Sequence, residues 1–77
     1  MQKSTHTAEY RALIDALVTA RQRAGLTQQA LADRLGKPQS FVAKFENRER
    51  RLDVVEFVAI CRSVGADPSS IISTVFR

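Results

Sequence analysis

The chain has 77 residues, of which 44% are hydrophobic and 26% are charged, and its 12 Lys and Arg exceed its 8 Asp and Glu to give a net charge of +4. This composition argues against wholesale disorder and predicts one folded domain with a thin core, because a domain of this size buries only about 60% of its unfolded surface. The positive balance favours polyanionic partners. The single cysteine, Cys61, excludes an internal disulfide and predicts a reducing compartment.

The first residues, 1–7 (MQKSTHT), have no periodic apolar pattern, so we expect them to form a flexible N-terminal tail. His6 lies there without a cluster of metal-ligating neighbours and is expected to be a solvated side chain. From Ala8 to Ala24 the apolar residues recur at helical spacing, which predicts a first helix. We expect residues 8–77 to form the folded domain.

Two short helices that meet at one tight corner are predicted within residues 26–46. Thr27 can cap the first of them, and Gly36 can end it in a left-handed conformation. Pro38 prevents its continuation and suits the first turn of the next helix, which is expected over about residues 38–47. Two such helices joined by a Gly-containing turn form a helix-turn-helix unit, whose second helix can enter the DNA major groove.

Two further helices are predicted after a polar link at residues 47–51. Asp53 can cap a fourth helix, which is nearly all apolar until Gly65 ends it and therefore has more apolar residues than one face requires. Asp67 followed by Pro68 is a start signal for a short fifth helix. Because no segment shows the strict alternation of a half-buried strand, the sequence predicts an all-α fold, a compact five-helix bundle.

Five short sequence runs in the middle of the chain, taken together with their spacing, form a pattern typical of a known protein family. They are Leu26-Thr27-Gln28, Ala30-Leu31-Ala32, Leu35-Gly36, Gln39-Ser40 and Glu46-Asn47. With these runs the chain resembles the Cro/C1-type, or XRE, family of helix-turn-helix DNA-binding domains over roughly residues 8–76. The resemblance implies a phage-repressor-like fold in which the second helix of the unit, the recognition helix, reads DNA.

The resemblance also implies a set of DNA contacts. Gln39 and Ser40 open the recognition helix and Lys44 lies one turn further along the same face, so these three are expected to read bases; Gln can bond bidentately to adenine, and Lys favours guanine. Phosphate contacts are expected from the helix start at Gln28 and from the polar link, through Asn47, Arg48, Arg50 and Arg51. All of these residues also have an ordinary structural interpretation, as first-turn residues or as a solvated charged face. Phe41 either contacts a thymine methyl group or packs inward.

Arg21 and Glu46 match family positions that form an ion pair, which would hold the first helix against the recognition helix. Two positions depart from the family pattern. Where the family usually has a hydroxyl residue this chain has Pro38, so the cap of the recognition helix falls on Lys37 or is lost, and the helix start can shift. Where the family commonly has Gly this chain has Arg48, which costs about 1–2 kcal/mol if that position is left-handed.

No pattern typical of an enzyme is present. The chain has no Gly-rich phosphate loop and no Cys or His cluster, and its one His and one Cys are far apart. We therefore expect no catalysis, cofactor, metal site or small-molecule ligand. No apolar stretch approaches the roughly 20 residues that span a bilayer, and the N-terminus lacks a secretory signal, so we expect no membrane association and a cytoplasmic location.

The combined interpretation is a sequence-specific DNA-binding transcriptional regulator, such as a repressor, that binds double-stranded DNA. One recognition helix touches few base pairs, so the resemblance implies a homodimer on a palindromic operator. Candidates for the dimer interface, which fit core packing equally well, are Val58, Ile72, Val75 and Phe76. The alternative function is a protein-interaction module, such as an antitoxin-like subunit that neutralises a toxin.

Overall fold

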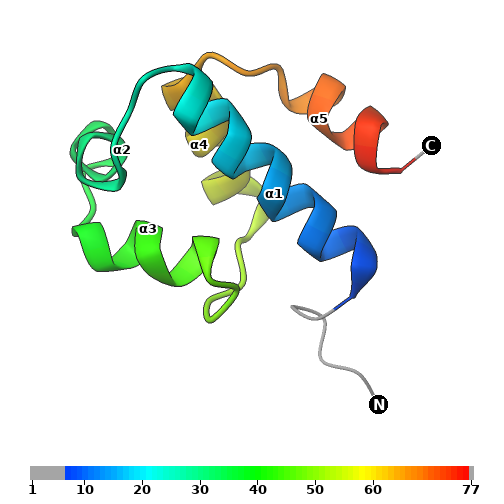
Figure 1. Ribbon diagram of the computed structural model, residues 1–77, viewed down its shortest axis with the longest axis horizontal. Helices are drawn as coiled ribbons and strands as arrows, with labels where there is room; N and C mark the ends of the chain where they lie inside the picture. Colours follow the sequence, from blue (N-terminus) through cyan, green and yellow to red (C-terminus); the bar gives the residue numbers. More distant parts are fainter. Residues whose placement is uncertain (1–6, 77) are drawn as a thin grey trace.

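A computed structural model describes residues 7–76, which form five α-helices and no strand (Figure 1). The helices are α1 (Ala8–Arg23), α2 (Gln28–Leu35), α3 (Gln39–Glu46), α4 (Val54–Val64) and α5 (Pro68–Val75). The predicted all-α, five-helix fold is therefore confirmed. Residues 1–6 of the expected tail, His6 among them, lie outside the described residues. None of the helices in the described part is long and apolar enough to cross a membrane.

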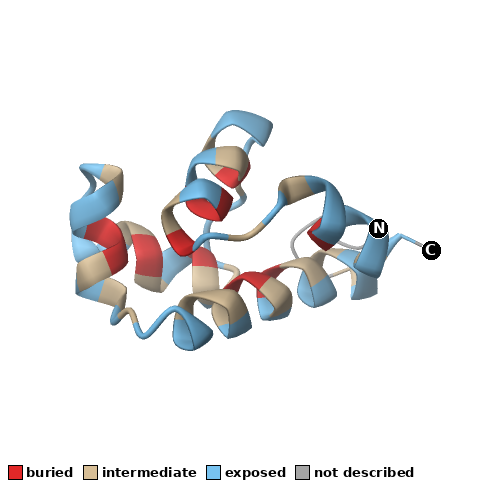
Figure 2. Ribbon diagram, turned by 90° about the horizontal axis from the view of Figure 1, so that it is seen from above, coloured by how far each residue is buried: buried red, intermediate tan, exposed pale blue. Residues whose placement is uncertain are grey.

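The core lies where the five helices meet. Helix α1 packs against α3, α4 and α5, while α2 packs against α3 and α4. The buried positions lie on the inward sides of the helices, and the outer sides are exposed (Figure 2). The largest fully buried side chains are Phe45, Ile14, Leu17, Leu31, Ile60, Val42 and Cys61. Cys61 is thus a core residue, and its burial raises the pKa of its thiol.

Side-chain caps start four of these helices. Thr7, the last residue of the expected tail, accepts a hydrogen bond from the Tyr10 backbone N–H at 3.1 Å and caps α1. Thr27 caps α2 in the same way. Asp53 begins α4 and Asp67 begins α5, where Pro68 occupies the first turn. The side-chain caps that the sequence predicted for α2, α4 and α5 therefore define the starts of these three helices.

The apolar excess predicted for the fourth helix lies at its start. Val54 and Val55, in the first turn of α4, are 76% and 79% exposed. Among the candidates for a dimer interface, Ile72 is 45% exposed and Phe76 is 57% exposed. The other two, Val58 and Val75, are half-buried, and Val58 packs against the core.

Candidate DNA-binding surface

The corner between α2 and α3 is built by backbone geometry. Gly36 has a φ of 66° and ends α2 in the left-handed conformation. Its N–H donates to the Asp33 carbonyl at 3.2 Å, and the Lys37 N–H donates to the Ala32 carbonyl at 3.0 Å. These are the two hydrogen bonds of a Schellman motif, which satisfy the last carbonyls of α2. The chain thereby reverses within a few residues and sets α3 beside α2.

The three proposed base-reading residues lie on the exposed side of α3. Gln39, Ser40 and Lys44 are all exposed, whereas Val42 and Phe45 on the same helix are buried. Helical geometry places Ser40 and Lys44 opposite the buried pair, and Gln39 at the start of the helix, beside α2. The packing of α3 therefore presents polar side chains outward along one surface.

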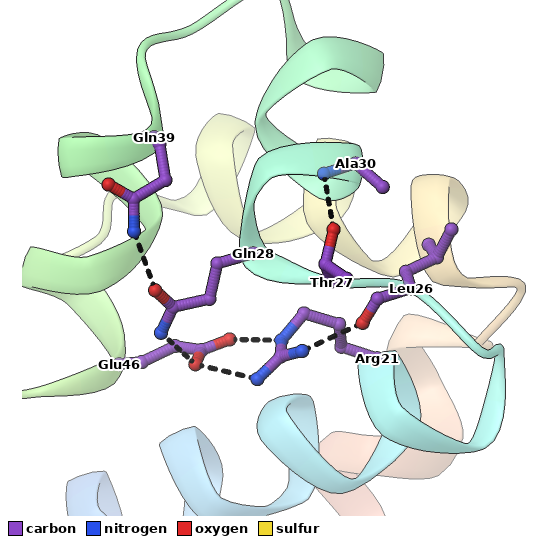
Figure 3. Close-up of polar contacts among 7 residues, drawn as sticks. All are labelled: Arg21, Leu26, Thr27, Gln28, Ala30, Gln39 and Glu46. Atoms are coloured by element: carbon purple, nitrogen blue, oxygen red, sulfur yellow. Dashed lines mark hydrogen bonds and ion pairs between the residues drawn. The ribbon is translucent and has the colours of Figure 1, made fainter.

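An ion pair joins α1 to the end of α3 (Figure 3). Arg21 donates from Nε to Glu46 Oε2 at 2.6 Å and from Nη2 to Glu46 Oε1 at 3.0 Å. Its Nη1 donates to the Leu26 carbonyl at 2.7 Å, so it also holds the connection between α1 and α2. The two side chains are only 11% and 7% exposed. The pair is shielded from water and fixes the relative placement of three elements.

The hydrogen bonds continue from this pair through α2 to the start of α3. Gln28 Nε2 donates to Glu46 Oε1 at 2.9 Å, and Gln39 Nε2 donates to Gln28 Oε1 at 2.7 Å (Figure 3). A carboxylate paired with Arg21 can only accept, so Gln28 must turn its N–H toward Glu46 and its oxygen toward Gln39. This fixes the direction of each amide. Gln39 is left with its carbonyl oxygen and a second N–H as an acceptor and a donor.

The loop after α3, residues 47–53 and below called the α3–α4 loop, carries the remaining candidates. Asn47 and Arg51 are exposed and Arg48 is half-buried. Arg50 is also exposed, but its guanidinium is paired: Nη1 and Nη2 donate to Glu56 Oε1 and Oε2 at 2.9 and 2.8 Å. These bonds lower the pKa of the Glu56 carboxyl and raise the pKa of Arg50.

Phe41 is half-buried on α3, and two cations lie close to its ring. Its ring centroid is 5.8 Å from that of Phe45, 4.8 Å from Arg50 Cζ and 5.7 Å from Lys37 Nζ.

Neither a role for Glu56 nor a contact between Arg50 and Phe41 was predicted from the sequence. The spacing Asp53-x-x-Glu56 is a capping-box signature that could have placed Glu56 at this helix start, although not beside Arg50.

The chain is similar to known helix-turn-helix proteins. The profile of a family described as Helix-turn-helix matches residues 17–71. A solved structure, an XRE-family like protein from Pseudomonas syringae pv. tomato str. DC3000, is 57% identical with a TM-score of 0.87, over 91% of this chain and 85% of that one. The chain belongs to the Cro/C1-type (XRE) helix-turn-helix family. The resemblance seen in the sequence is thereby confirmed, and the chain is a DNA-binding helix-turn-helix regulator. No curated protein matches it.

This XRE-family chain departs from the family pattern where the sequence indicated. Pro38 is the N-cap residue of α3 and supplies no side-chain hydrogen bond, so the side-chain cap is lost at Pro38 and does not fall on Lys37. The helix spans Gln39–Glu46, one residue shorter at each end than expected. Arg48 has a φ of 60°, the left-handed conformation in which Gly is favoured. Within residues 7–76 no group of His, Cys, Asp or Glu could hold a metal ion.

Proposed function

We propose that this XRE-family regulator binds a palindromic operator as a homodimer, with α3 in the major groove of each half-site. The observation that supports this most strongly is the hydrogen-bond chain from Arg21 through Glu46 and Gln28 to Gln39. It fixes a glutamine amide at the exposed start of the recognition helix before DNA binds. A preorganised reading group loses less conformational entropy on binding than a mobile one.

Base reading is assigned to the exposed side of α3. The free oxygen and N–H of Gln39 suit the N6 amino group and N7 of adenine, which a glutamine contacts bidentately. Lys44 can donate to the O6 and N7 acceptors of guanine, and Ser40 can bond to either kind of base. Each bidentate contact is worth about 1–3 kcal/mol of discrimination against the wrong base.

Phosphate contacts are assigned to both sides of this reading surface. At Gln28 the side chain is engaged by Glu46 and Gln39, so the phosphate contact falls to the backbone N–H groups at the start of α2. On the other side, Asn47, Arg48 and Arg51 of the α3–α4 loop approach the DNA backbone. The net charge of +4 favours the same partner. This function requires access to the genome and therefore a cytoplasmic location.

Dimerisation is assigned to the exposed apolar side chains Ile72 and Phe76, on and just after α5, with the half-buried Val58 and Val75 as further candidates. Two copies related by a two-fold axis place their recognition helices in successive major grooves when half-sites lie about 34 Å apart. A dimer seated on an operator would exclude other proteins from that DNA, so we assign repression as its mode of action.

The test is selection of bound sequences from a random duplex pool with the purified protein. The proposal predicts enrichment of an inverted repeat whose half-sites contain adenine and guanine at fixed positions. A Gln39→Ala variant should still select the repeat but should lose the preference for adenine at one position of each half-site. If the parent protein enriches no motif, the proposed function is wrong, and the protein-interaction alternative gains support.

A further inference from the structure

Arg50 differs from the other arginines of the α3–α4 loop because its guanidinium is already engaged. Two of its nitrogens bind both carboxylate oxygens of Glu56, at 2.9 and 2.8 Å, in a bidentate pair. Its Nη1 also donates to the Arg51 carbonyl at 3.1 Å. The neighbouring Arg51 is exposed, and its side chain makes no hydrogen bond or ion pair with the described residues. Two adjacent arginines therefore have different surroundings.

The groups that hold Arg50 belong to separate elements. Glu56 lies in the first turn of α4, where its Oε1 also accepts from the Asp53 backbone N–H at 3.0 Å to complete a capping box. The guanidinium carbon Cζ lies 4.8 Å from the ring centroid of Phe41, which is part of the recognition helix. Arg50 thus joins α3, the loop and the start of α4 through one planar group.

The loop to which Arg50 belongs carries three proposed phosphate ligands, Asn47, Arg48 and Arg51, and Arg48 has a positive φ. Without Gly at residue 48 the left-handed turn is strained, and two backbone hydrogen bonds hold it at the end of α3, from the Arg48 N–H to the Phe45 carbonyl at 3.0 Å and from the Glu49 N–H to the Lys44 carbonyl at 2.9 Å. Further along the loop, the Tyr10 hydroxyl accepts a hydrogen bond from the Leu52 N–H at 3.1 Å. Between Arg48 and Leu52, the Arg50 side chain contacts both Glu56 and Phe41 and so adds a tertiary contact to the loop.

We propose that Arg50 is a positioning residue for DNA recognition: the Glu56 carboxylate and the Phe41 ring hold its guanidinium so that it fixes the α3–α4 loop against the recognition helix, and it does not bind a phosphate. The pair is 42% exposed at Arg50 and 18% at Glu56, so it orders a surface and contributes little to the core. This inference rests on the proposed function, since it assigns a role within the same DNA-binding surface.

The two roles open to Arg50 predict opposite effects for Glu56→Gln. This change removes a negative charge and weakens the hold on Arg50. If Arg50 were a phosphate ligand, its release would strengthen binding to any duplex. If Arg50 is a positioning residue, its release loosens the loop. Affinity for the selected operator should then fall about 2- to 30-fold, the effect typical of residues that act on a binding site without contacting the ligand, while affinity for a scrambled duplex should not fall.

A matched control is available in the same loop. Glu49 is exposed, and Glu49→Gln makes the same charge change without touching Arg50. We expect Glu49→Gln to strengthen binding to both duplexes, since it only removes repulsion from phosphate. A purely structural role of the pair would lower the melting temperature of Glu56→Gln but leave the ratio of operator to scrambled affinity unchanged, which would overturn the inference.

Salt dependence provides a second, charge-neutral test. In the double variant Arg50→Gln with Glu56→Gln, the net charge is unchanged. The slope of log affinity against log salt should stay at the parent value, whereas Arg51→Gln should reduce it by about 0.9, the value for one phosphate contact. A slope reduced by about 0.9 in the double variant would assign Arg50 to a phosphate.

These titrations, by fluorescence anisotropy with folded full-length protein, separate the two proposals. A parent that shows no preference for any duplex would overturn the proposed function and this inference with it. A parent that prefers its operator, combined with a Glu56→Gln variant that binds both duplexes more tightly, would overturn this inference alone. Operator affinity that falls in Glu56→Gln but rises in Glu49→Gln would support it.

Discussion

Replacing Arg21 with Ala should both destabilise the fold and impair DNA recognition. The change leaves the Glu46 carboxylate, only 7% exposed, with Gln28 as its one remaining side-chain donor in the described structure, and it also releases the Leu26 carbonyl. Breaking a buried pair by removing one partner costs about 3–5 kcal/mol. A chain of this length has about 4–12 kcal/mol of unfolding free energy in total, at about 0.05–0.15 kcal/mol per residue.

The expected result is a melting temperature lower by about 12 °C or more, since 1 kcal/mol shifts a domain of this size by about 4–8 °C. Thermal unfolding followed by circular dichroism measures it. Arg23→Ala, at an exposed position on the same helix, is the control and should change unfolding free energy by no more than about 0.5 kcal/mol. The reasoning is refuted if Arg21→Ala melts within a degree of the parent and binds the operator normally.

Three further results are expected. Arg48→Gly should raise the melting temperature, because the relief of about 1–2 kcal/mol of left-handed strain exceeds the cost of the added unfolded-state entropy of Gly. The same change should reduce the slope of log affinity for DNA against log salt by about 0.9, and a lower melting temperature would contradict the strain assignment. Ile72→Glu should keep the helical spectrum of the parent but shift sedimentation toward monomer, and an unchanged dimer would remove α5 from the interface. Glu56→Gln should be less stable than the parent above pH 4.5, the ordinary pKa of the carboxyl. Because the pKa of Glu56 is lowered in the folded state, the difference in unfolding free energy between parent and variant should shrink as pH falls below 4.5, and a difference that does not change with pH would contradict the ion pair.

The helix boundaries could be predicted from the sequence because they depend on local chemistry. Thr27, Gly36, Asp53 and Asp67 act on backbone groups within a few residues of themselves, so cap and turn preferences suffice to place them. The family pattern added the pairing of Arg21 with Glu46, which lie 25 positions apart and which no local rule could join.

The distinction between Arg50 and Arg51 could not be predicted in the same way. The two are adjacent and identical in type, and only the path of the α3–α4 loop brings one of them to Glu56 and Phe41. That path depends on the left-handed turn at Arg48, which a sequence can suggest but not place in space. Gln28 is a similar case, because the direction of its amide follows from the Glu46 carboxylate across the fold.

The exposed valines show a limit of apolar patterning. Val54 and Val55 fit the apolar run of α4 and would be assigned to the core by residue type alone. They lie in the first turn of α4, beyond the reach of the helices that cover the rest of it. Composition gives the amount of apolar surface, but only the packing of neighbouring helices decides which part of it is covered.

The most direct test of the central claim, that Gln39 held by Gln28 reads an adenine, is a cycle that combines protein and DNA changes. Each adenine of the selected half-site is replaced in turn by 7-deazaadenine, which lacks the N7 acceptor, and affinity is measured for the parent and for Gln39→Ala. We expect one position at which the replacement weakens parent binding by about 5- to 150-fold but leaves Gln39→Ala unaffected. Equal losses for both proteins at every position would contradict the claim.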